Sequence, residues 1–295
     1  AGTVVTGVTW SVDEGAAGGT ITVDGLYTAP MSGGPYHVTA RSLADPSKAV
    51  TATVQITDAG FRLLNSSLLE PRYVPTATLL PNGKVLIAGG SWCPNAIGCV
   101  PDDPALAIAE LFDPVTETFT ATGSMSTGRT GHTATLLING TVLVTGGWGE
   151  NGSENRTAEI YNPATGSFTL VGNMSGGRVW HSASLLGDGR VLIAGGYRGD
   201  WFSCCSSTRT AEIYDPATQS FSLAGNMPTE ATSHTASALF NGTVLVVGGL
   251  GGSCPTSQTA VAVFDPATNS FGGGVSLPNA RAQHTATTLH DGRVL

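Results

Sequence analysis

Histidines are the residues of this 295-residue chain whose type and spacing suggest chemistry most directly. They recur at intervals of 49, 53 and 50 residues, each at the start of a run of Thr, Ser and Ala, as His132, His181, His234 and His284. Pro75 takes this position in an earlier copy of the run. Equivalent imidazoles could bind a metal ion. Strand side chains in neighbouring sheets point between the sheets, however, so we expect these rings to pack and form hydrogen bonds there, without a metal.

Cysteines form a second set of reactive residues, and all of them fall in segments that follow a Gly-Gly pair: Cys93, Cys99, Cys204, Cys205 and Cys254. They contain no Cys-x-x-Cys pair of the metal-binding type. Cysteines clustered in loops of this kind indicate disulfides and an oxidising compartment. Cys93 and Cys99 can close a short loop, and Cys254 can pair with Cys205 or with Cys204, which leaves one cysteine over.

The same segments carry residues that could bind a partner, four of them aromatic and one an arginine: Trp92, Trp148, Tyr197, Arg198 and Trp201. Aromatic rings beside arginine could form a platform for a sugar ring or a protein. Alternatively, the rings fill gaps between neighbouring sheets. Arginines also precede the histidine runs, as Arg72, Arg129, Arg178 and Arg281. Because this arginine recurs, we expect it to tie neighbouring segments together by hydrogen bonds.

These residues are positioned by a repeat of about 50 residues. Each copy contains an apolar run that ends in two glycines: Gly89-Gly90, Gly146-Gly147, Gly195-Gly196 and Gly248-Gly249. A preceding Asn-Gly or Asp-Gly pair, such as Asn82-Gly83, predicts a hairpin whose two central residues both have positive φ. A second hairpin is indicated by aromatic residues seven apart, as at Tyr161 and Phe168, with a proline in the turn. Two hairpins make a four-stranded sheet.

The diglycine and the spaced aromatic pair resemble the kelch repeat, with Phe168 and its equivalents in the place of the family's tryptophan. The resemblance implies an all-β fold, a kelch-type β-propeller with four complete four-stranded blades plus a partial blade at residues 284–295. We assign residues 59–295 to this propeller, incomplete at its C-terminal end. Residues 1–58 resemble part of a bacterial Ig-like β-sandwich.

Composition excludes some classes of partner. The net charge of −8 and the pI near 5.1 argue against nucleic acid, which selects for basic surfaces. No apolar stretch is long enough to insert into a membrane. Asp102-Asp103 could help to bind Ca²⁺, but no series of oxygen ligands surrounds this pair, so we expect an exposed acidic turn and no cofactor.

The favoured function is a secreted, non-enzymatic binding or structural module at the cell surface or outside the cell, which presents its loops to a glycan or protein. Self-assembly into a filament or surface layer is an alternative. A second alternative is a copper radical oxidase, because Tyr73 and Gly89-Gly90-Ser91-Trp92 resemble part of the galactose oxidase site. That family needs a cysteine upstream of this tyrosine, and no cysteine precedes Tyr73.

Overall fold

A computed structural model describes residues 7–30, 35–54, 64–92, 104–199, 206–252 and 256–295. The chain divides into two compact units, Ala1–Leu64 and Asn65–Leu295. In the first unit a three-stranded antiparallel sheet has the order β1-β4-β5, and β2 pairs with β3. The elements are β1 (Val8–Val12), the 3₁₀ turn η1 (Gly15–Gly18), β2 (Thr20–Ile21), β3 (Tyr27–Thr28), β4 (Tyr36–Ser42) and β5 (Ala49–Val54). This unit is made of short strands, as a resemblance to a β-sandwich implies, whereas the Ig-like assignment stays a prediction.

The described part of the second unit contains four four-stranded antiparallel sheets, each built from two successive hairpins. We call them blades 1 to 4. Blade 1 is β7 (Thr76–Leu79), β8 (Val85–Ala88), β10 (Ala109–Asp113) and β11 (Thr118–Ala121); blade 2 is β12 (Thr133–Leu136), β13 (Val142–Thr145), β14 (Thr157–Asn162) and β15 (Ser167–Asn173). Blade 3 is β16 (Ser182–Leu185), β17 (Val191–Ala194), β20 (Thr210–Asp215) and β21 (Ser220–Asn226); blade 4 is β22 (Thr235–Ala238), β23 (Val244–Val247), β26 (Val261–Asp265) and β27 (Ser270–Gly273).

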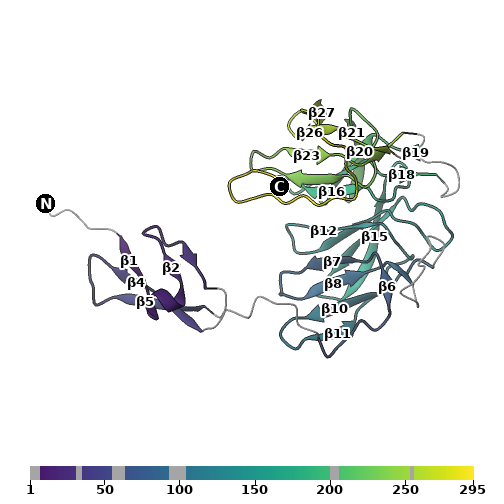
Figure 1. Ribbon diagram of the computed structural model, residues 1–295. Coiled ribbons are helices and arrows are strands. Elements are labelled where there is room, and N and C mark those ends of the chain that lie inside the picture. The colour runs from purple at the N-terminus through teal and green to yellow at the C-terminus, as the bar shows by residue number, and fades with distance from the viewer. Residues whose placement is uncertain (1–6, 31–34, 55–63, 93–103, 200–205, 253–255) are drawn as a thin grey trace. The chain divides into compact units, whose positions relative to one another are not determined.

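Neighbouring blades contact each other through their first strands, in the order β7, β12, β16 and β22. Figure 1 shows the four sheets following one another in chain order, each facing the next. Three apolar cores fill the spaces between blades 1 and 2, 2 and 3, and 3 and 4. The sheets are therefore stacked face to face as blades, as the repeat predicts. A further hairpin at residues 287–295 begins the partial blade.

The aromatic residues seven apart lie directly opposite each other on the third and fourth strands of each blade. Tyr161 pairs with Phe168 and Tyr214 with Phe221. Their ring centroids lie 4.8 and 5.0 Å apart in tilted arrangements. Tyr161 and Tyr214 are buried in the cores between blades, so the spacing sets both the register of the hairpin and the packing of the next blade.

The prediction for the Asn-Gly turns is wrong in one detail. Only the glycine has positive φ, as in Gly83 at +82° and Gly140 at +82°, and the asparagine does not. The reason is the length of the loop: Leu80 donates its N–H to the carbonyl of Lys84, which leaves three residues in the turn. A three-residue hairpin loop needs one left-handed residue after its type I turn, and glycine supplies it.

Candidate functional site

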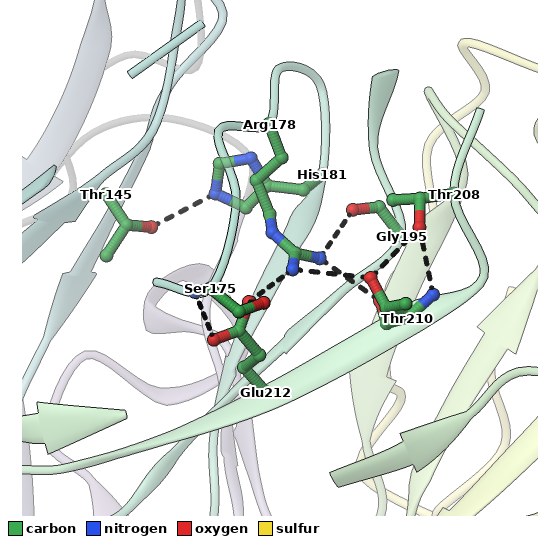
Figure 2. Close-up of polar contacts among 8 residues, drawn as sticks. All are labelled: Thr145, Ser175, Arg178, His181, Gly195, Thr208, Thr210 and Glu212. Atoms are coloured by element: carbon green, nitrogen blue, oxygen red, sulfur yellow. Dashed lines mark hydrogen bonds and ion pairs between the residues drawn. The ribbon is translucent and has the colours of Figure 1, made fainter. Parts of the chain in front are cut away.

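The recurring arginine is a buried structural ion pair, and Figure 2 shows the copy in blade 3. Arg178 lies just before β16. Its Nη1 donates to the carbonyls of Gly195 (2.9 Å) and Thr210 (3.1 Å), and its Nη2 donates to the Glu212 carboxylate (2.5 Å). Ser175 donates its backbone N–H to the other carboxylate oxygen at 2.8 Å. Every charged group in this set therefore has a partner inside the protein.

Burial explains why both charges must be present. The Arg178 side chain is fully buried and the Glu212 side chain is 2% exposed. Loss of water lowers the pKa of Arg178, and the negative charge of Glu212 opposes this shift. A buried guanidinium without a carboxylate is strongly unfavourable, so the two residues stabilise the fold only as a pair.

The same arrangement occurs in blades 1 and 2. Arg129 Nη2 lies 2.9 Å from the Glu159 carboxylate, which also accepts the N–H of Ser126 at 2.8 Å. Arg72 pairs with Glu110 in blade 1. The predicted hydrogen-bonding role of these three arginines is confirmed, whereas Arg281 is exposed. Sequence reasoning missed the glutamates, although Ala-Glu two residues before the aromatic recurs in three copies.

The histidines join neighbouring blades, as expected. His181 Nε2 lies 3.0 Å from the hydroxyls of both Thr133 and Thr145 in blade 2. His132, His234 and His284 each contact one hydroxyl of the preceding blade at 2.9 to 3.0 Å, on Thr76, Ser182 and Thr235. Burial lowers the pKa of His132 to about 3 and of His234 to about 4, so these rings are neutral at physiological pH.

Neither residue of the diglycine has room for a Cβ, because the link into the next blade lies against the first glycine and the link into the same blade lies against the second. A Cβ on Gly146 (φ +67°) would lie 2.5 Å from the carbonyl oxygen of Arg178 and 2.7 Å from the His181 ring. A Cβ on Gly147 would lie 2.9 Å from the His132 side chain. Since backbone cannot give way at such distances, only glycine fits, and the diglycine, the arginine and the histidine form one structural unit.

The segments after the diglycines lie beside the links between blades, and together they form a surface that we call the loop face. Backbone pairing joins the segment after the first diglycine to a link in one two-stranded ribbon, β6 (Arg72–Tyr73) with β9 (Ser91–Trp92). Two further ribbons each pair two parts of a single post-diglycine segment: β18 (Tyr197–Arg198) with β19 (Ser206–Ser207), and β24 (Leu250–Gly251) with β25 (Thr256–Ser257). Isolated bridges add Thr130 to Trp148 and Val179 to Tyr197. The segments after the diglycines and the links therefore lie at the same end of the strands.

The predicted aromatic residues of the loop face separate into two groups. Trp148 and Tyr197 are 5% and 6% exposed and pack with Val179 and Trp180, with the Trp148 and Tyr197 rings 5.7 Å apart. Little of either ring is open to a partner, which corresponds to the gap-filling alternative. Trp92 is 42% exposed. Tyr73, on the strand paired with that of Trp92, is 57% exposed.

The remaining predicted residues bear less directly on a site. Arg198 is partly exposed and lies against Gly176. Trp201, the five cysteines and Asp102-Asp103 lie outside the described residues, so the disulfides and the calcium site stay predictions. Within the described ranges, no three His, Cys, Asp or Glu side chains gather as metal ligands. That part of the chain also has no helix of the length and hydropathy of a membrane span.

Comparisons with known proteins agree with this architecture. The kelch motif matches residues 129–175 and 181–228, which are blades 2 and 3 with their links. A solved structure titled "Structure of YjhT" is similar over 87% of this chain and 82% of its own, with a TM-score of 0.61 and 13% sequence identity. No curated protein matches the sequence. The motifs and the four-stranded sheets together support a kelch β-propeller, a fold that suggests a binding or structural module.

Proposed function

We propose that this chain is an extracellular, non-enzymatic binding module that presents its loop face to a glycan or protein. The observation that carries the proposal is that the recurring polar residues are buried and bonded inside the protein, whereas some non-recurring aromatic residues are exposed. The recurring arginines and glutamates of blades 1 to 3 are buried and paired with each other, and the recurring histidines are hydrogen-bonded to hydroxyl groups of the preceding blade. Groups that are committed in this way are not available to a substrate.

The exposed aromatic residues have the opposite character. Tyr73 and Trp92 lie on one short ribbon, β6 with β9, and both keep a large part of their rings open to solvent. Exposing such rings costs free energy in water unless a partner covers them, and indole and phenol rings supply contact area with few rotatable bonds. Stacking on a sugar ring or packing against a protein side chain would use this surface.

A screen with the full chain against glycans and cell-surface polymers tests the proposal. Binding should fall at least tenfold in Trp92→Ala and in Tyr73→Ala, without loss of folding. Phe240→Ala is the matched control, since Phe240 is 72% exposed but lies in the turn between β22 and β23, at the opposite end of the strands. Equal binding by all three variants would contradict the assignment of the site.

A further inference from the structure

Blade 4 departs from the other blades at three positions that act together. Arg178 and its equivalents lie three residues before the histidine, where blade 4 has Ala231. Glu212 and its equivalents lie two residues before the buried aromatic, where blade 4 has Ala262. The residue whose N–H donates to the carboxylate, Ser175 in blade 3, is replaced by Pro228.

These replacements are chemically consistent with one another. Removing the guanidinium alone would leave a buried carboxylate, and removing both would leave a backbone N–H without an acceptor. Proline has no N–H, so its presence at position 228 removes that cost as well. Blade 4 therefore lacks every donor and charge of the ion-pair set.

The acceptors of the set remain. In blade 3 the guanidinium donates to the carbonyls of Gly195 and Thr210, and the corresponding residues of blade 4 are Gly248 and Ala260. Among the described residues, none donates a hydrogen bond to the Gly248 carbonyl. The Ala260 carbonyl accepts the N–H of Gly248 at 2.8 Å and keeps a second lone pair.

A pocket of about 10 Å³, partly open on the side of the exposed Thr229, lies at this position and is lined by Met227, Thr229, Ala231, Val246, Gly248, Ala260 and Ala262. We call it the blade 4 slot. A space of roughly 10 to 15 Å³, measured over the positions open to the centre of a water, holds one water molecule when at least two polar partners are present. A guanidinium would be buried there without a carboxylate, and an apolar ligand would leave the carbonyls unpaired.

We propose that the blade 4 slot is a binding site for one internal water molecule, which donates hydrogen bonds to the carbonyls of Gly248 and Ala260 in place of the guanidinium of the other blades. The water takes over the link between strand and diglycine that the arginine makes elsewhere. Blade 4 thus keeps its geometry without a buried charge.

A crystal structure of the full chain, at a resolution that orders internal waters, tests this assignment. Density for one water within hydrogen-bond distance of both carbonyls is the expected result. A slot closed by its side chains, or one without density, would overturn it. Magnetic relaxation dispersion of water provides a check in solution: one long-lived water should be lost in Ala262→Val, which fills the slot, and kept in the surface variant Phe240→Ala. Loss of no water in a folded Ala262→Val would also contradict the assignment.

Discussion

Glu159→Ala is the variant that exposes the role of the buried ion pairs most clearly. The Arg129 side chain is fully buried, and Glu159 is its only acidic partner among the described residues. Truncating the glutamate leaves the guanidinium without a carboxylate and the N–H of Ser126 without an acceptor. Leaving one buried charge uncompensated costs about 3–5 kcal/mol, so we expect the free energy of unfolding of the unit Asn65–Leu295 to fall by this amount.

The double variant Arg129→Ala/Glu159→Ala should cost less than the sum of the two single changes. It removes both charges, and what remains is a cavity and the unpaired Ser126 N–H, worth about 1–3 kcal/mol. Adding Ser126→Pro gives blade 2 the same three residue types that blade 4 has at these positions. It should recover part of the lost stability because it removes the unpaired N–H, and the link before the blade has the same course in blades 2 and 4. Between residues in contact, the interaction free energy obtained from such a double-mutant cycle is about 0.5–3 kcal/mol.

Urea unfolding followed by circular dichroism measures these differences. Arg190→Ala/Asp188→Ala is the matched control, since this ion pair has a similar separation of 2.7 Å but 33% and 47% exposed side chains. An exposed pair contributes about 0–1 kcal/mol. A cost for Glu159→Ala as small as that of the control, or strict additivity of the two single changes, would refute the proposed role of the buried pair.

Three further outcomes follow from the described contacts. Gly146→Ala should lower the stability by about 1–3 kcal/mol more than Gly152→Ala, as measured by urea unfolding, because both glycines have positive φ but a Cβ on Gly152 meets nothing within 4 Å. The folded pKa of His132 and His234 lies below the unfolded value near 6.5, so the unfolded state takes up protons first as the pH falls. Stability should therefore be constant above about pH 6.5 and decrease toward about pH 4, by up to about 1.4 kcal/mol per pH unit for each histidine; a flat profile would contradict the buried, neutral rings. Copper analysis with a hydrogen peroxide assay should find neither stoichiometric copper nor turnover, and turnover with copper would favour the oxidase alternative. Treatment with EDTA should leave the melting temperature unchanged.

Hairpins and registers were predictable from the sequence because they depend on local chemistry. The spacing from Tyr161 to Phe168 sets a cross-strand pair, and the Asn-Gly turns need a left-handed glycine. The turn type was not predictable, since it depends on whether two or three residues close the loop. Val74, just before blade 1, and Trp180, in the link between blades 2 and 3, also have a left-handed conformation that no turn signal in the sequence indicates.

The candidate site was predictable only in part. Recurrence marked the arginines as structural, and the structure confirms this for Arg178 through its bonds to Glu212. Trp148 directly follows its diglycine, as the buried Tyr197 does, whereas Trp92 is the second residue after its diglycine. Successive residues of a strand point to opposite sides, so this difference in position was a signal that could have separated the buried Trp148 from the exposed Trp92. The slot in blade 4 depends on Ala231 and Ala262, which are far apart in the chain. Their role becomes visible only when they are compared with the arginine and glutamate at the same positions in the other blades.

The central claim is that the recurring buried residues stabilise the fold and that the exposed, non-recurring residues bind the ligand. Measuring ligand affinity and unfolding free energy on the same two variants tests it most directly. With a ligand identified by the screen, Trp92→Ala should weaken binding at least tenfold and change the unfolding free energy by less than about 0.5 kcal/mol. Glu159→Ala should lower the unfolding free energy and leave the ligand affinity unchanged, under conditions in which the chain stays folded. Unchanged affinity in Trp92→Ala, with binding lost in a folded and stable Glu159→Ala, would contradict the account.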